Sequence, residues 1–332
     1  MAPGHDGVGL LQRAISEKLA PWGVNVLILE VNYGYEFQSH PDLRGDDEGG
    51  PLRREDVRAL KETCTRNNIR LIPMFNCLGH QSWSGATFSL LTRHPDLDET
   101  PGVPKSNEGI YCRSWCPLHP EVNKIVFALI DELIDAFGAD AFHVGMDEVF
   151  LIGSPGCPRC KGKDPAELFA RSVNDLHRHI TREKKLTMLM WGDRLLDDSK
   201  FKYGKWEASA NSTAAAIDRI PKDIVVCDWH YEKRPEGYPS IGYLQEKGFR
   251  VLPSTWRDKD AALAMLADAR RGATERMIGH VCTTWTPAQE VCRALLEEAP
   301  ARVEKPKSNS RRTEAQDIVA TLKACMDELK KN

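Results

Sequence analysis

Residues 141–148 read Ala-Phe-His-Val-Gly-Met-Asp-Glu, a short apolar stretch that ends in two adjacent carboxylates. It is one of seven short apolar runs in the chain, each of a length typical of a strand buried on both faces. Longer segments with helical periodicity separate most of these runs. The runs cover residues 24–31, 69–76, 141–147, 186–191, 224–229, 249–256 and 279–285.

This alternation of strand and helix predicts a parallel sheet with helical crossovers. The predicted helices cover residues 10–19, 55–66, 121–137, 165–183, 261–270, 287–298 and 318–329. An eight-stranded barrel needs about 250 residues, and a doubly wound open sheet is the competing arrangement. The chain of 332 residues is long enough for either.

We predict an α/β protein with a (β/α)8 TIM-type barrel that lacks its first strand. A helix precedes the first apolar run, and residues 1–9 are too rich in glycine to supply a good strand. We expect residues 1–304 to form the barrel. Residues 305–332 should form a polar linker and a C-terminal helix that packs on it.

Composition excludes several classes of function. The formal net charge of -3 gives no basic field for nucleic acid or for an anionic membrane. No apolar run approaches the roughly 20 residues that cross a bilayer. The first residues carry no secretion signal, and the ten cysteines are scattered as in intracellular proteins. We therefore expect a cytoplasmic protein, although an incomplete N-terminus would leave export open.

The eight tryptophans are not evenly distributed. Four of them end successive predicted strands, which would place their rings around one end of a barrel. Flat apolar rings suit the C–H faces of sugars, and the alternative is that one or two of them cap the core. The strand-end rings are Trp191, Trp229, Trp256 and Trp285, with Trp83 just after an earlier strand, whereas we interpret Trp22, Trp115 and Trp206 as structural.

The run that opened this section also carries the strongest catalytic candidates. Side chains alternate along a strand, so His143, Gly145 and Asp147 should share the inner face. Glu148 follows at the strand end. Two neighbouring carboxylates resist ionising together, which suits one as a general acid and the other as a charged stabiliser. The alternative is a solvated strand end.

Further polar candidates follow other strands. His80 comes directly after the second predicted strand, and Asp193 and Tyr231 come after later ones. Two cysteine pairs lie in predicted loops and could hold a structural zinc ion, the alternative being free thiols or a local disulfide. These cysteines are Cys112, Cys116, Cys157 and Cys160.

Residues 142–149 (FHVGMDEV) resemble the catalytic strand of the family 20 glycoside hydrolases, the β-N-acetylhexosaminidases. Met146 replaces the second of two glycines that are common before Asp-Glu there, and this position also varies in the hexosaminidase D-like branch. The resemblance covers about residues 10 to 300. It also includes residues 71–80 (LIPMFNCLGH), 115–122 (WCPLHPEV), 188–197 (MLMWGDRLLD) and 283–297 (TTWTPAQEVCRALLE).

The resemblance implies an exo-acting retaining β-N-acetylhexosaminidase that needs no metal and no other cofactor. Its partner would be a glycoside or glycan with terminal β-linked GlcNAc or GalNAc, and the substrate's acetamide would replace an enzyme nucleophile. Asp147 would orient and stabilise the acetamide, and Glu148 would be the general acid and base. The implied substrate-binding residues are His80, His143, Trp191, Asp193, Trp229, Tyr231, Trp256, Trp285 and Glu30. The alternative is a non-catalytic glycan-binding barrel.

Overall fold

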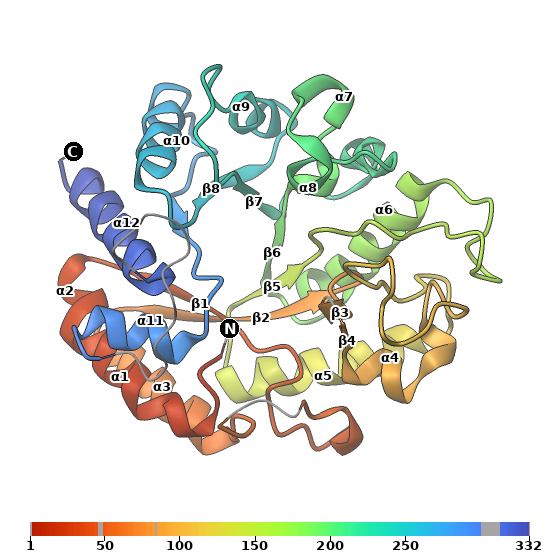
Figure 1. Cartoon of the computed structure of the whole chain (residues 1–332), viewed down its shortest axis with the longest axis horizontal. Coiled ribbons are helices and arrows are strands. Elements are labelled where there is room, and N and C mark those ends of the chain that lie inside the picture. The colour runs from red at the N-terminus through yellow and green to blue at the C-terminus, as the bar shows by residue number, and fades with distance from the viewer. Residues whose placement is uncertain (1, 46–48, 84, 300–312, 332) are drawn as a thin grey trace.

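The structure is a computed structural model that describes residues 2–45, 49–83, 85–299 and 313–331. Within these residues seven parallel strands form one curled sheet, in the order β1-β2-β5-β6-β7-β8-β9 (Figure 1). Each of the seven predicted strands is found, which confirms the barrel-type fold. The bounds are β1 Val26–Glu30, β2 Arg70–Cys77, β5 Ala141–Gly145, β6 Thr187–Trp191, β7 Val225–Trp229, β8 Arg250–Thr255 and β9 Val281–Cys282.

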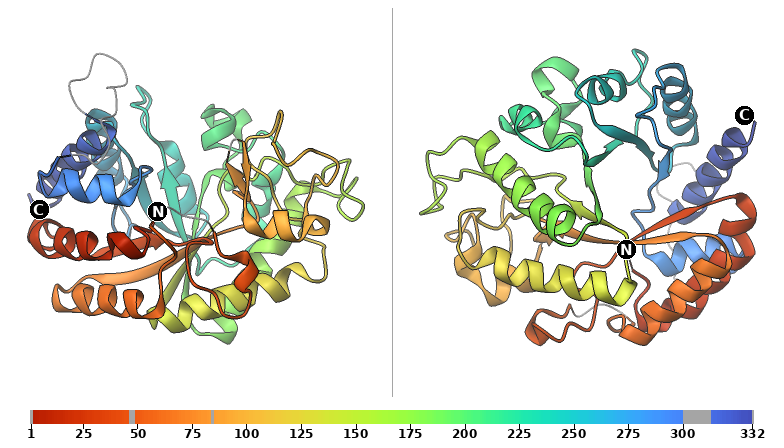
Figure 2. Two further views of the ribbon diagram at one scale, coloured as in Figure 1. Left: turned by 60° about the horizontal axis from the view of Figure 1, so that its bottom comes forward. Right: turned by 180° about the vertical axis from the view of Figure 1, so that it is seen from behind.

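Helices surround the strands, as the two views of Figure 2 show. The longer ones agree with the predicted helices except α9, which contains Gly242 and has too weak a sequence pattern to be recognised. A two-stranded sheet of β3 (Ser82–Trp83) and β4 (Ala86–Thr87) lies in the loop after β2. The α-helices are α1 Val8–Ala14, α2 Ala20–Trp22, α3 Arg54–Arg66, α4 Ser89–Arg93, α5 Val122–Phe137, α6 Pro165–His177, α7 Asp198–Phe201, α8 Gly204–Glu207, α9 Pro239–Glu246, α10 Lys259–Arg271, α11 Ala288–Leu295 and α12 Glu314–Leu329. Shorter 3-10 or π segments are His5–Gly7, Ile15–Leu19, Pro41–Leu43, Pro95–Leu97, Arg178–Glu183, Asp193–Leu195 and Thr213–Arg219.

Local sequence accounts for the long helices around the sheet. In α5 a stripe of aliphatic side chains is buried against the strands, and Gly138 ends the helix with a φ of 49°. In α6 Asp164 caps the first turn by accepting a hydrogen bond from Ala166 N, and Pro165 takes the first helical position. These signals fix where each crossover helix begins or ends.

The described sheet has two edges, at β1 and at β9. The Ala2 N–H donates a hydrogen bond to Glu30 O at 2.6 Å, so residue 2 lies against the carboxyl end of β1. Val26 and Ile278, next to the two edges, keep 39% and 45% of their surface exposed. Outside the sheet, α1 packs on α11 and α12 packs on both α10 and α11. The outer layer of helices therefore continues across the position of the predicted missing strand.

The helix α12 covers Glu314–Leu329 and packs on α10 and α11. The predicted linker at residues 305–312 lies outside the described residues, so a domain boundary at residue 304 stays a prediction. None of the described helices has the length and apolar character that crossing a membrane requires.

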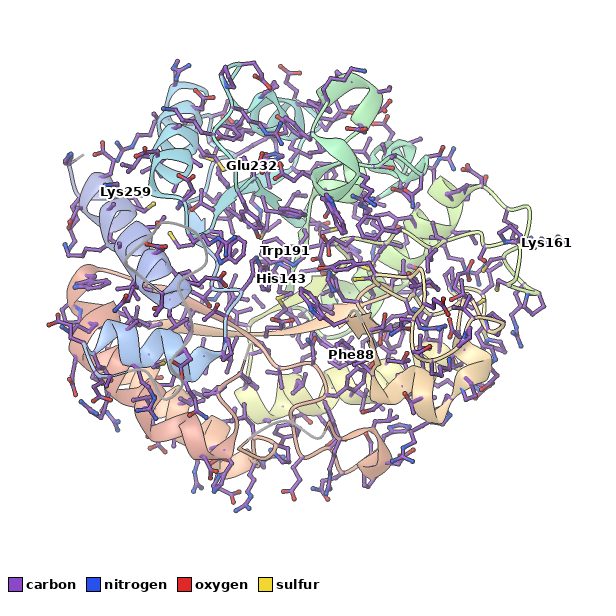
Figure 3. The ribbon with its side chains drawn as sticks, viewed as in Figure 1. Phe88, His143, Lys161, Trp191, Glu232 and Lys259 are labelled. Atoms are coloured by element: carbon purple, nitrogen blue, oxygen red, sulfur yellow. The ribbon has the colours of Figure 1, made fainter. Side chains whose placement is uncertain are left out.

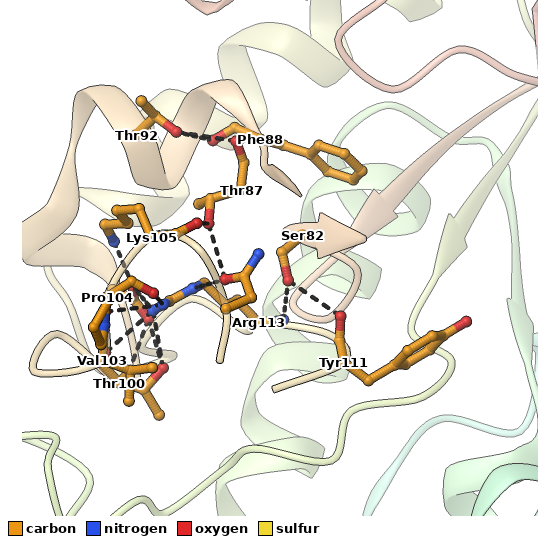
Figure 4. A network of polar contacts seen from close by, with 12 residues as sticks. Ser82, Thr87, Phe88, Thr92, Thr100, Val103, Pro104, Lys105, Tyr111 and Arg113 are labelled. Carbon is orange, nitrogen blue, oxygen red and sulfur yellow. Dashed lines mark hydrogen bonds and ion pairs between the residues drawn. The ribbon is translucent and has the colours of Figure 1, made fainter. Parts of the chain in front are cut away.

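One buried arginine organises the long loop between β2 and α5 (Figure 4). The Arg113 side chain is fully buried, and its Nη1 lies 2.6 Å from Asp98 Oδ2. The same guanidinium donates to the side chain of Asn107 and to the carbonyls of Val103 and Pro104. Because these acceptors lie on separate turns, the Arg113 guanidinium ties those turns together, in addition to the apolar side chains that the loop buries in the main core.

We expect Arg113→Met to destabilise the protein by about 3–5 kcal/mol, because it leaves Asp98 buried with only Lys105 as a cationic partner. The free energy of unfolding in urea measures this. The control is Arg70→Met, which removes an exposed ion pair with Asp140 and should cost less than about 1 kcal/mol. Equal stability of the two variants would contradict the organising role of Arg113.

Candidate active site

The carboxyl ends of β2, β5, β6 and β7 meet at one end of the sheet. His143 on β5 and Trp191 on β6 lie together near the centre of the ring in Figure 3, with ring centroids 4.6 Å apart. The register between β2 and β5 shifts, because Met74 pairs with His143 whereas Cys77 pairs with Gly145. This bulge-like irregularity falls beside the predicted catalytic residues, where bulges commonly re-aim side chains.

One imidazole joins the two predicted catalytic carboxylates. His80 Nε2 lies 3.0 Å from Asp147 Oδ2 and 3.0 Å from Glu148 Oε2. Both carboxylate side chains keep 12% of their surface exposed, and the histidine side chain keeps 8%. On its other side the imidazole Nδ1 lies 3.4 Å from Cys112 Sγ. His80 therefore holds together two carboxylates that would otherwise repel each other.

The charges in this group give the two carboxylates different environments. Burial alone would lower the His80 pKa, but the Asp147 charge and the bonds to Asp147, Cys112 and Glu148 outweigh it and hold that pKa well above its usual value. Burial raises the Glu148 pKa, opposed by His80 and reinforced by the charges of Asp147 and Asp193. A raised pKa suits Glu148 to hold a proton and donate it.

The backbone that presents these residues is strained. Met146 and Glu148 have φ values of 73° and 49°, in the left-handed region where a side chain costs roughly 1–2 kcal/mol. Met146 is also fully buried. A φ of this kind is adopted most readily by glycine, so the Met146 side chain adds strain at this position. Strain of this kind persists only where surrounding contacts impose it.

Asp193 supplies such a contact. Its Oδ2 accepts hydrogen bonds from Glu148 N at 2.9 Å and from Arg194 Nε at 2.7 Å. Its Oδ1 accepts a longer one from Trp229 Nε1 at 3.3 Å. Burial raises the Asp193 pKa, which the Arg194 charge opposes. The carboxylate thus fixes the backbone of Glu148 and one of the predicted sugar-binding rings together.

Four predicted aromatic residues form one cluster beside the carboxylates. Trp191 and Trp285 have ring centroids 5.7 Å apart, and Trp285 Nε1 donates to the Tyr231 hydroxyl at 2.5 Å. Trp229 lies 4.9 Å from the Tyr231 ring. Trp256 contacts only the outer side of this cluster, 5.4 Å from Tyr231, and its other face carries the Arg257 guanidinium.

Glu30, at the carboxyl end of β1, is bound by two asparagine side chains. Its Oε1 accepts hydrogen bonds from Asn32 Nδ2 and Asn76 Nδ2, both at 2.8 Å. The neighbouring Tyr33 hydroxyl donates to Gln81 Oε1 at 2.6 Å, and Gln81 directly follows His80 in the chain. Glu30 and Tyr33 thus brace the turn that carries His80.

Several buried polar atoms around the carboxylates have no hydrogen-bond partner among the described residues. They include His143 Nε2, Asp147 Oδ1 and Trp191 Nε1. The other His143 nitrogen accepts from Gly145 N at 3.0 Å, and burial lowers the His143 pKa to about 3, so this imidazole is neutral. Buried polar groups nearly always have a partner, so these atoms are ready to bind polar groups of a ligand.

Comparisons with known proteins assign the family. Residues 31–295 match the profile of the glycosyl hydrolase family 20 catalytic domain. The chain belongs to glycosyl hydrolase family 20. Among curated proteins it is similar to hexosaminidase D from Bos taurus, with 24% identity over 182 residues that cover 53% of this chain and 48% of that protein. It is also similar to a beta-hexosaminidase from Emericella nidulans, with 29% identity over 42% of this chain and 21% of that protein.

The family 20 chain thus spans less than half the length of these two curated relatives. Solved structures support the fold. A chitobiase from Flavobacterium johnsoniae has a TM-score of 0.66 and 19% identity, over 97% of this chain and 50% of that one. A β-N-acetylhexosaminidase from Bacteroides fragilis has a TM-score of 0.64 and 14% identity, over 98% of this chain and 69% of that one.

The sequence did not reveal an aromatic rim outside the carboxylates of this family 20 domain. The rim is formed by Trp83, Tyr111, Phe150 and Trp206, whose neighbouring rings lie 4.8–6.3 Å apart. Trp83 also stacks on His80, with a centroid distance of 5.8 Å. Trp206, interpreted from the sequence as structural, is 40% exposed and packs edge-on against Tyr111 and Phe150. The rim residues lie in loops or in the very short elements β3 and α8, where sequence periodicity gives no signal.

The four cysteines considered for zinc do not form one group. Cys112 lies against His80 in the active site, whereas Cys116, Cys157 and Cys160 lie together with Glu99. Cys112 is therefore not a fourth ligand of the same site, because the turn between Cys112 and Cys116 directs the two thiols to different surroundings.

We expect Gly145→Ala to destabilise the family 20 domain by at least about 2 kcal/mol. A Cβ at Gly145 would lie 2.4 Å from Asn76 Oδ1 and 2.9 Å from Asn76 Cα, and the φ of 67° adds backbone strain. Urea unfolding measures the loss. Gly9→Ala is the control, since no atom lies within 4 Å there and the α1 helix should gain about 0.5–1 kcal/mol. A Gly145→Ala variant as stable as wild type would refute the close packing of β5 on Asn76.

Proposed function

We propose that the protein is an exo-acting retaining β-N-acetylhexosaminidase that removes terminal β-linked GlcNAc or GalNAc by substrate-assisted catalysis. The observation that carries this proposal is the contact of one histidine, His80, with both carboxylates of the Asp147-Glu148 pair. A single cation beside two carboxyl groups balances the charge when one of them is ionised and the other is protonated. That is the state that a charged stabiliser and a general acid require.

The proposed reaction has two steps. In the first, the acetamide oxygen of the substrate attacks the anomeric carbon, the glycosidic C–O bond breaks, and Glu148 gives its proton to the leaving oxygen. Asp147 orients the acetamide and stabilises its developing positive charge. In the second, water attacks the anomeric carbon, gives a proton to Glu148 and restores the acetamide. Two inversions at one carbon retain its configuration, and adjacent carboxylates suffice because the substrate supplies the nucleophile.

The buried groups around Asp147 support recognition of an N-acetyl sugar. Asp147 Oδ1 is an acceptor without a partner among the described residues, as an acetamide N–H requires. Trp191 Nε1 is a buried donor that also has no acceptor among the described residues. The cluster of Trp191, Trp229, Tyr231 and Trp285 supplies the apolar walls for a methyl group and a sugar ring.

The relatives support the same class of substrate. The curated relatives are named as hexosaminidases, and a family 20 exo β-N-acetylglucosaminidase from Vibrio harveyi was solved with N-acetylglucosamine, at a TM-score of 0.57. We assign the aromatic rim of Trp83, Tyr111, Phe150 and Trp206 to the leaving group. The exposed Trp83 ring provides a flat apolar surface on which a second sugar can stack.

We expect Glu148→Gln to lower kcat/KM for N-acetyl-β-glucosaminides by about 100- to 10,000-fold, because the general acid is lost. The loss should be smaller for aryl glycosides whose leaving group needs no proton. Release of the aryl group and of sugar from chitobiose-type substrates measures both. The exposed Glu246 on α9 provides the control Glu246→Gln, which should keep wild-type rates.

Two outcomes would count against hydrolysis through Glu148. Unchanged activity of Glu148→Gln would remove the residue from the acid role. Binding of N-acetylhexosamine by the wild-type chain with no turnover on any aryl or natural substrate would favour the non-catalytic glycan-binding barrel.

We expect Asp193→Asn to move the alkaline limb of the kcat/KM profile to lower pH. The active form has Glu148 protonated, and the Asp193 charge helps to raise the Glu148 pKa, so its removal lowers that pKa. We also expect kcat to fall about 10-fold or more as Glu148 loses its fixed position. Trp229→Phe removes a donor to Asp193 without changing charge, so its alkaline limb should stay in place. A shift to higher pH in Asp193→Asn would contradict this electrostatic role.

A further inference from the structure

A second cluster of reactive side chains lies outside the carboxylate site. It contains Glu99 and Cys116 from the loop between β2 and α5, and Cys157 and Cys160 from the loop between β5 and α6. One potential ligand atom from each residue lies within 4.8 Å of those of the other three. All four residues are at most 1% exposed.

The sulfur positions fit a shared ion better than a disulfide. Cys116 Sγ lies 3.3 Å from Cys160 Sγ and 3.4 Å from Cys157 Sγ, far beyond the roughly 2.05 Å of an S–S bond. A tetrahedral zinc ion with bonds of about 2.3 Å would hold sulfurs about 3.8 Å apart. Small side-chain movements would reach that spacing.

A backbone amide is directed at one of the sulfurs. Cys160 N–H donates to Cys157 Sγ at 3.4 Å, within the Cys-x-x-Cys turn. Amide donors to sulfur stabilise the negative charge that a metal-bound cysteine carries.

Glu99 provides an independent observation. It is fully buried, and its Oε1 accepts a hydrogen bond from Ser154 N at 2.8 Å. Its Oε2 is also buried but has no hydrogen-bond partner among the described residues. The carboxylate faces the thiols of Cys157 and Cys160. A buried carboxylate oxygen without a donor is costly, and a cation among the thiols would satisfy it.

We infer that Glu99, Cys116, Cys157 and Cys160 bind one Zn²⁺ ion. Three thiolates and a carboxylate match the ligands and the coordination number of structural zinc, and a complete set of four leaves no position for a substrate. Four anionic ligands and one divalent cation leave two negative charges. The same loop carries the cations Arg159, Lys161 and Lys163, which reduce the cost of that charge.

The ion would join the two loops that hold the catalytic groups. Cys116 lies near the end of the loop that begins beside His80. Cys157 and Cys160 lie in the loop that begins at Asp147 and Glu148. The two loops also meet through the bond between Ser154 N and Glu99. The inferred role of the zinc is therefore structural, and it does not depend on the proposed glycosidase activity.

The test is the metal content of the full chain, purified under reducing conditions without chelator, by elemental mass spectrometry. We expect about one zinc per chain. Cys116→Ser and Cys157→Ser should lose most of the zinc, and Glu99→Gln should bind it more weakly than wild type in competition with a chromogenic chelator. The control Cys64→Ser changes a buried cysteine of α3 outside the cluster and should retain the metal.

A second measurement uses the wild-type protein, so that it remains informative if the cysteine variants fail to fold. Cobalt added to metal-free wild-type protein should give the thiolate-to-metal charge-transfer absorption of a tetrahedral site, and zinc should abolish it and raise the Tm. His280, Cys282 and Cys325 form another group with metal-ligand spacing, so Cys325→Ser is a further control that should keep the zinc. Loss of zinc in Cys325→Ser but not in Cys116→Ser would overturn the inference. So would the absence of both zinc and cobalt binding, or a native mass showing a disulfide within the cluster.

Discussion

The position of His80 between Asp147 and Glu148 is the interaction on which the candidate site depends. Two buried carboxylates this close would repel each other strongly if both were ionised. The imidazolium lowers that cost, and burial keeps the pKa of Glu148 raised in spite of it. The same contact also joins two barrel segments, since His80 follows β2 and the carboxylates follow β5.

The surroundings of this contact are built to hold a strained backbone. Glu148 has a positive φ, and the hydrogen bond from its N–H to Asp193 keeps it there. Asp193 in turn is held by the buried Arg194, whose guanidinium also donates to two carbonyls of α8 and to the Ala208 carbonyl just after it. The buried Asp193 charge, which would be costly in isolation, thus fixes the positions of both Glu148 and Trp229.

The loops carry more of the organisation than the strands do. On the β2 side, Arg113 holds the loop together through its guanidinium, and its backbone carbonyl accepts a hydrogen bond from Gln81 N, next to His80. On the β5 side the cluster of Glu99 and three cysteines links the same two loops. Both devices use buried polar groups, which add to the apolar side chains that these loops bury in the main core, such as Leu97, Trp115 and Val149.

Sequence by itself was sufficient for the seven strands and for the family, whereas the positive φ values of Gly145, Met146 and Glu148 place Asp147 beyond the reach of strand alternation. Strand periodicity and the Asp-Glu motif are local properties, set by hydrophobic burial over a few residues. Only the tertiary structure brought His80 to the carboxylates, separated Cys112 from the other cysteines and added Glu99 to them. These contacts join residues that are 17 to 68 positions apart in the chain, and no local sequence pattern encodes such pairings. The tertiary structure also determined the aromatic rim that includes Trp206, because the conformation of the connecting segments, and not residue type, determines which rings face the site.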